Sequence, residues 1–107
     1  MIVRNDDVKL SDLGSGVSRK ILSHVDSMMM VEVNFIKGAV GEIHAHVHEQ
    51  ISYIIKGSFQ IDIKGEKKII KTGDTFYIEP DVLHGVTALE DSTILDVFTP
   101  QREDFLK

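Results

Sequence analysis

The sequence contains no cysteine. Disulfides, zinc ribbons, thiol catalysis and thiol-based redox sensing are therefore excluded. No apolar run approaches the length of a transmembrane helix, so we expect no membrane span. The first residues, Met-Ile-Val-Arg-Asn-Asp-Asp, lack a basic region followed by a long apolar run. We therefore expect no signal peptide, and a cytoplasmic location is the default expectation.

Positive charge is scarce, with 12 Lys and Arg against 17 Asp and Glu and a formal net charge of −5. This balance argues against sequence-independent binding of nucleic acid, which needs basic patches. An anionic substrate would have to be attracted by a local cation, because the overall field of the protein repels it. The 107 residues, 42% hydrophobic and 27% charged, are typical of one soluble domain spanning residues 1–107.

Short alternating runs rich in Val, Ile, Phe and Thr are separated by Gly, Asp and Pro. No window has a helical period, apart from a possible turn within Gln101–Leu106. This spacing predicts an all-β fold, an antiparallel sandwich or barrel. The predicted strands are Val17–Val25, Met29–Ile36, Glu42–Val47, Gln50–Lys56, Phe59–Ile63, Lys68–Lys71, Thr75–Ile78, His84–Ala88 and Thr93–Phe98.

Two histidines, His44 and His46, stand one residue apart and are predicted to lie on one face of a strand. Their Cα atoms would then be about 7 Å apart, so both imidazoles could bind one ion at about 2.1 Å. A straight strand would carry the chain too far for further ligands, so we expect it to bend after His46. A tight return would place Gln50 beside the two rings. His84 begins another predicted strand and could enter the same cavity.

The predicted site therefore contains three imidazoles and the amide oxygen of Gln50, around one divalent transition metal (Ni, Zn, Mn or Fe). Because Gln is neutral, the ion would keep its full charge and act as a stronger Lewis acid. His48 and Glu49 are expected at the rim, and His24 belongs to no cluster. The alternative is that all of these are ordinary surface or core histidines without an ion.

A carboxylate, Asp96, interrupts the apolar run Thr93–Phe98. Strand alternation places it on the same face as Ile94 and Phe98. If that face lines the interior, the buried carboxylate should have a raised pKa, which suits general acid–base catalysis. The alternative is an edge-strand Asp that points to water.

Two segments resemble the conserved motifs of the cupin family. Residues 38–57, with the pattern Gly38-x5-His44-x-His46-x3-Gln50-x6-Gly57, are similar to the first cupin motif, except that Gln50 replaces the usual Glu. Residues 73–84 resemble the second motif and end at His84. This resemblance implies a cupin-type double-stranded β-helix, a jelly-roll barrel of antiparallel strands with its metal inside. It also implies a homodimer, with the N-terminal strands as the expected contact.

A narrower resemblance is to the small cupins of pectin and alginate breakdown, carried by the segments 48–53, 80–86 and 95–105. Those proteins convert cyclic 4,5-unsaturated uronates, left by polysaccharide lyases, into open-chain 4-deoxy-5-keto acids. The resemblance implies that the substrate is a small anionic sugar. It also implies a ligand set and three catalytic residues: His44, His46, Gln50 and His84 on the metal, with Asp96, Phe98 and Arg102 around the substrate.

In the implied reaction the metal polarises substrate oxygens and Asp96 moves the proton. Arg102 folds over the barrel mouth to hold the sugar carboxylate, and Phe98 packs against the ring. From composition alone, Arg102 could equally be a solvated charge in an acidic tail. Two other functions stay open, a metal-dependent cupin dioxygenase and a non-catalytic sugar-binding or sensing cupin.

Overall fold

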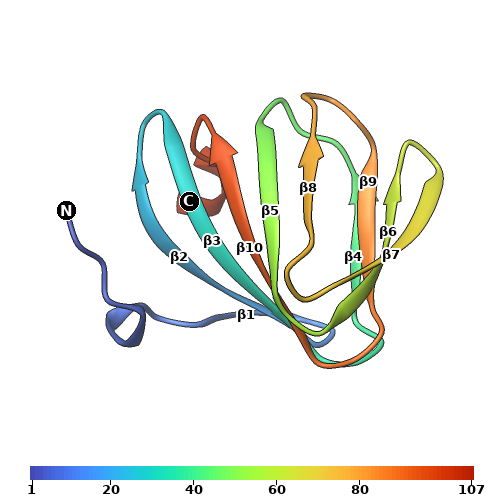
Figure 1. The fold of residues 1–107 in the computed structure, drawn as a ribbon. Helices are drawn as coiled ribbons and strands as arrows, with labels where there is room; N and C mark the ends of the chain where they lie inside the picture. The colour runs from blue at the N-terminus through green and yellow to red at the C-terminus, as the bar shows by residue number, and fades with distance from the viewer.

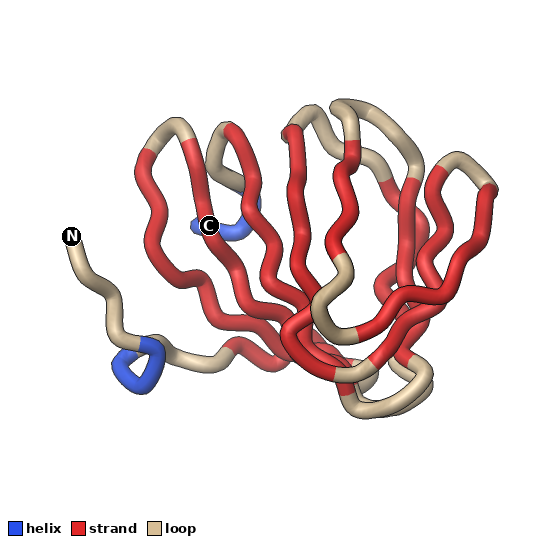
Figure 2. Tube along the Cα trace, viewed as in Figure 1, coloured by secondary structure: helices blue, strands red, loops and turns tan.

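The computed structural model describes residues 1–107 and consists almost entirely of β-strands, every one of which pairs antiparallel with its neighbours (Figures 1 and 2). None of the helical segments is long and apolar enough to cross a membrane. The predicted all-β antiparallel class is confirmed. The elements are η1 (Asn5–Asp7), β1 (Ser11–Gly14), β2 (Val17–Val25), β3 (Met28–Phe35), β4 (Val40–His44), β5 (Glu49–Lys56), β6 (Ser58–Ile63), β7 (Glu66–Lys71), β8 (Thr75–Ile78), β9 (His84–Ala88), β10 (Ser92–Thr99) and η2 (Glu103–Leu106).

The strands form two sheets, one with the order β1-β2-β3-β10-β5-β8 and one with the order β4-β9-β6-β7. After β3 the chain passes repeatedly from one sheet to the other, as in a jelly roll. In Figure 1 the strands of both sheets converge at the lower edge and spread apart toward the top. The end of β4 and the starts of β5 and β9 meet at this upper, open end.

The core lies between the sheets. Its larger cluster is centred on Phe59, which is fully buried and meets Phe35 edge to face with ring centroids 5.1 Å apart. Along strand β5 the buried side chains change from apolar to polar. Its inward positions change from the buried Ile54 to the buried polar residues Ser52 and Gln50 toward the open end.

Most strand boundaries agree with the sequence prediction within two residues, but two differences are informative. Strand β1 was missed because its Ser-Asp-Leu-Gly sequence has no apolar alternation and all four residues are exposed. The strand predicted over Glu42–Val47 is instead β4, which ends at His44 because the chain there crosses to the other sheet. The prediction that His44 and His46 share one strand face is therefore wrong.

Replacing Phe59 by Ala should lower the free energy of unfolding by about 3–5 kcal/mol, because the cavity left among well-packed side chains cannot collapse fully. Ile69, which is 73% exposed on β7, is the matched control and should lose at most about 0.5 kcal/mol as Ile69→Ala. Urea unfolding of both variants measures the difference. Equal losses would contradict this description of the core.

Candidate metal centre

Three histidines converge at the open end of the two sheets, although His46 lies in the loop after β4. His44, the last residue of β4, pairs in register with His84, the first residue of β9. One ring nitrogen from each of the three residues lies within 4.8 Å of the others. Their ring centroids are 4.5 to 5.5 Å apart. Two strands and a loop thus bring three imidazoles to one point.

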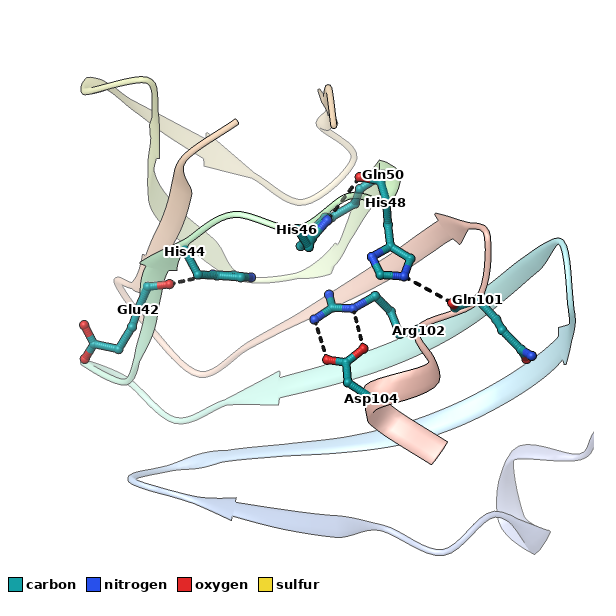
Figure 3. Close-up of polar contacts among 8 residues, drawn as sticks. All are labelled: Glu42, His44, His46, His48, Gln50, Gln101, Arg102 and Asp104. Atoms are coloured by element: carbon teal, nitrogen blue, oxygen red, sulfur yellow. Dashed lines mark hydrogen bonds and ion pairs between the residues drawn. The ribbon is translucent and has the colours of Figure 1, made fainter. Parts of the chain in front are cut away.

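Backbone carbonyls fix the tautomer of each ring. Nδ1–H of His44 donates to the carbonyl of Glu42 at 2.7 Å, as Figure 3 shows. Nδ1–H of His84 donates to the carbonyl of Val82 at 2.8 Å. His46 donates in the same way, at 3.1 Å, to the carbonyl two residues further on. Because a carbonyl only accepts, Nδ1 carries the hydrogen and Nε2 is left with a lone pair, the arrangement that metal-binding histidines adopt.

The pKa values of two of the three rings, those of His46 and His84, are also lowered. Burial, followed by the positive charges of Arg102 and His84, lowers the pKa of His46 to about 4. Burial likewise lowers the pKa of His84. A neutral imidazole is the form that binds a metal ion, so these environments favour coordination.

Gln50 presents its amide oxygen to the same point. Its Nε2 donates to Ser52 Oγ at 2.9 Å and to Asp96 Oδ1 at 3.2 Å. These bonds turn Oε1 toward Nε2 of His46, 3.0 Å away (Figure 3). Both facing atoms carry lone pairs and neither has a hydrogen to share, an arrangement that is unfavourable unless a cation joins them.

The donor set therefore fits a divalent metal. Two ligands bound about 2.1 Å from one ion and at right angles would be about 3.0 Å apart, as the facing His46 and Gln50 atoms are. Three imidazole nitrogens and one neutral oxygen suit Ni, Zn, Mn or Fe. The assignment of these residues as metal ligands stays a prediction, and the geometry gives no reason to revise it.

Asp96 faces the interior from β10, which rules out the alternative in which it points to water. Its Oδ1 accepts hydrogen bonds from Ser52 Oγ at 2.6 Å and from Gln50 Nε2 at 3.2 Å, whereas Oδ2 has no partner. Burial raises the pKa of Asp96 to about 6, against the opposing effects of Ser52, Arg102 and Gln50. The carboxylate is thus anchored by one oxygen and has the other available.

A cavity of about 180 Å³ adjoins these groups. It is smaller than the roughly 300–1,000 Å³ pockets that hold drug-sized ligands, so it suits a ligand no larger than about one sugar ring. A larger cavity of about 410 Å³, beside β7 and β8, contains none of these side chains. The polar lining of the smaller cavity consists of Arg19, His44, Gln50, His84, Asp96 and Arg102.

Arg102 is buried, with 8% of its surface exposed, so the alternative of a solvated tail charge is wrong. Its Nε and Nη2 donate to the two carboxylate oxygens of Asp104 at 3.1 and 2.9 Å. Its guanidinium also lies over the rings of Phe105 and Phe98, at 4.2 and 5.0 Å from their centroids. In Figure 3 the remaining nitrogen, Nη1, points away from Asp104 toward the histidines.

The other predicted residues lie around this centre. Phe98, only 2% exposed, forms an apolar wall of the cavity and meets the ring of His46 edge to face at 5.6 Å. His48 donates from Nε2 to the carbonyl of Gln101 at 3.2 Å and stands outside the histidine cluster. Glu49 is exposed and accepts a hydrogen bond from the hydroxyl of Tyr77.

One residue of the cavity was missed by sequence reasoning. Arg19 lies on β2 and lines the cavity with its side chain. The signal was present in the sequence, because Arg19 alternates with Val17 and Ile21 and so occupies an inward-facing position of an otherwise half-apolar strand.

Fold and site together define a cupin, and residues 31–98 match the family model described as "Cupin domain". The chain belongs to the cupin family. It is 46% identical over 104 residues to the pectin degradation protein KdgF of Dickeya dadantii (strain 3937), covering 95% of this chain and 94% of that protein.

Two solved structures are similar along nearly their whole length. The structure of KdgF from Halomonas sp. has a TM-score of 0.94 and 38% identity, covering 98% of this chain and 97% of that one. An RmlC-like cupin from Shewanella frigidimarina NCIMB 400 has a TM-score of 0.94 and 36% identity, covering 97% and 94%. The jelly-roll architecture predicted from the motifs is confirmed.

Replacing His84 by Ala should abolish stoichiometric metal binding, because it removes one of three converging nitrogens and leaves the others too few to hold the ion. Elemental analysis after loading with Ni²⁺, Zn²⁺ or Mn²⁺ and desalting provides the measurement. His24→Ala is the matched control, since His24 contacts Gln101 and lies outside the cluster. Retention of one metal per chain by His84→Ala would contradict the ligand assignment.

Proposed function

We propose that this cupin converts 4,5-unsaturated uronates, products of pectin and alginate breakdown, into linear 4-deoxy-5-keto sugars. The extensive similarity to KdgF, a pectin degradation protein, supports this function. The observation that carries the proposal is the hydrogen-bonded juxtaposition of Asp96 and Gln50 beside three convergent imidazoles. A carboxylate with one free oxygen thus adjoins a set of metal-binding groups inside a sugar-sized cavity.

The reaction is an isomerisation, which needs neither an oxidant nor water. The proton of the C1 hydroxyl leaves, the bond between C1 and the ring oxygen breaks, and C1 becomes an aldehyde. The ring oxygen remains on C5 as an enolate, and a proton added at C4 turns that enolate into the C5 ketone. One proton therefore moves from the C1 oxygen to C4, and a single base positioned near both atoms can carry it.

Asp96 is the residue we assign to this transfer. Its Oδ1 is held by Ser52 and Gln50, which fixes the carboxylate in place, and the unpartnered Oδ2 is free to take up and return a proton. A divalent transition metal held by His44, His46, Gln50 and His84 would supply Lewis acidity toward substrate oxygens. The neutral Gln50 leaves the positive charge of such an ion undiminished.

Arg102 is assigned to the substrate carboxylate. Asp104 occupies Nε and Nη2, so Nη1 and the second hydrogen of Nη2 stay available as donors. Arg102 thus provides the local positive charge that an anionic substrate needs, because the net charge of −5 repels such a substrate. Phe98 supplies an apolar surface for the sugar ring and supports the guanidinium through a cation–π contact.

Asp96→Asn should reduce turnover of a 4,5-unsaturated uronate by about 10²–10⁴-fold, because an amide cannot carry the proton. Metal content should be unchanged, since Asn retains an oxygen acceptor for Gln50. The loss of the ultraviolet absorbance of the unsaturated bond measures the rate. Asp91→Asn is the matched control, because Asp91 is exposed and accepts a hydrogen bond from the Lys37 amide far from the cavity.

Wild-type protein loaded with metal should consume the uronate without consuming oxygen. Oxygen uptake coupled to substrate loss would indicate a dioxygenase, and uronate binding without turnover would indicate a sensing or storage cupin. Unchanged turnover in Asp96→Asn would remove Asp96 from the mechanism.

A further inference from the structure

Arg19 holds a positive charge on the interior face of the six-stranded sheet. On β2 it stands between Val17 and Ile21, which pack against the two hydrophobic clusters of the core. In register it pairs with Val33, which in turn pairs with the buried Ile94. Side chains paired in this way point to the same face of a sheet, so this guanidinium replaces what would otherwise be an apolar core position.

No group of the protein neutralises this charge by direct contact. The Arg19 side chain takes part in no hydrogen bond or ion pair, and its Nε is buried without a partner. Its guanidinium lies over the face of Phe105, whose centroid is 3.7 Å from Cζ. Burial and then the like charge of Arg102 lower the pKa of Arg19, against the weaker attraction of the Asp104 carboxylate, although a guanidinium stays charged at neutral pH. A partly buried charge without an ion-pair partner costs free energy, and an anion from outside would offset that cost.

Arg19 and Arg102 differ in one respect that assigns their roles. Arg102 already has a carboxylate partner in Asp104, whereas Arg19 has none. Both guanidinium carbons lie within 4.2 Å of the Phe105 ring centre, and both side chains line the cavity that contains His44 and Asp96. The two cations therefore share one aromatic neighbour and one cavity, the setting in which a single carboxylate can bind both.

We propose that Arg19 is a second substrate-binding cation, which binds the carboxylate of a sugar acid together with Arg102. This inference rests on the proposed function for the identity of the sugar. It goes beyond that function in naming a binding residue from the opposite end of the chain. It also makes the cavity selective for carboxylated over neutral sugars, because a neutral ligand would leave the charge of Arg19 unpaired.

The test is Arg19→Met, which removes the charge and keeps a long apolar side chain against Phe105. We expect KM for the unsaturated uronate to rise about tenfold or more, because a hydrogen bond to a charged group is lost. The value of kcat should change less than about twofold, as expected for a contact present in both ground state and transition state. The melting temperature should be unchanged or higher, because a partly buried charge without an ion-pair partner has been removed.

Lys20→Met is the matched control. Lys20 is the next residue of β2, and its Nζ donates to Asn5 on the outside of the sheet, so the same charge is lost away from the cavity. Its KM should stay within about twofold of wild type. If Arg19→Met does not fold, Arg19→Lys takes its place. The lysine variant should still have a raised KM, because it lacks the guanidinium fork. A wild-type KM in the folded Arg19 variant would overturn the proposal.

Calorimetric titration of metal-loaded protein separates this inference from the proposed function. Wild type should bind D-galacturonate more tightly than D-galactose, and Arg19→Met should lose about tenfold of that preference. If wild type turns over no unsaturated uronate, the proposed function fails, and this preference still tests Arg19. If wild type is active but the preference is equal in both proteins, the assignment of Arg19 fails alone.

Discussion

The candidate metal centre depends on two lone-pair atoms, Nε2 of His46 and Oε1 of Gln50, which face each other 3.0 Å apart. Each is held there by a hydrogen bond made on its far side. The His46 ring donates from Nδ1 to a backbone carbonyl, and the Gln50 amide donates to Ser52 and Asp96. Without a hydrogen between them, two lone-pair atoms repel each other at this distance. A cation bound to both makes the arrangement favourable.

The same hydrogen bonds connect the predicted metal centre to the predicted base. Gln50 Nε2 donates to the Asp96 carboxylate, so the residue that would hold the ion also orients the residue that would move the proton. Ser52, fully buried on β5, donates to the same oxygen and fixes the pair from behind. A substitution at Ser52 would therefore disturb both metal binding by Gln50 and proton transfer by Asp96, although Ser52 itself is assigned no contact with the metal or the substrate.

The jelly-roll topology is what assembles these groups. His44 and Gln50 are near in sequence but belong to opposite sheets, and His84 comes from a strand paired with β4. Asp96 enters from β10, the immediate neighbour of β5 in the larger sheet. The sheets spread apart at this end. The cavity between them extends from His44, Gln50 and His84 to Val17 and Phe35 of the apolar core.

Much of this was accessible from the sequence. The alternation of Thr93–Phe98 placed Asp96 on the same face as Ile94 and Phe98, and the spacing of the histidines indicated a common ion. The position of His46 was not accessible in the same way, because the end of β4 depends on a crossing between sheets that local pattern does not encode. The pairing of Arg102 with Asp104 belongs to an irregular tail, where no periodicity predicts which way a side chain turns. Arg19 could have been found, since a charge at an inward position of β2 is visible in the alternation.

The most direct test of the central claim is anomalous diffraction from crystals of the protein loaded with Ni²⁺, Zn²⁺ or Mn²⁺, measured at the absorption edge of the metal. We predict one strong anomalous peak per chain, about 2.1 Å from Nε2 of His44, His46 and His84 and from Oε1 of Gln50. A peak elsewhere, or metal-loaded crystals in which Gln50 turns its amide oxygen away from the histidines, would contradict it.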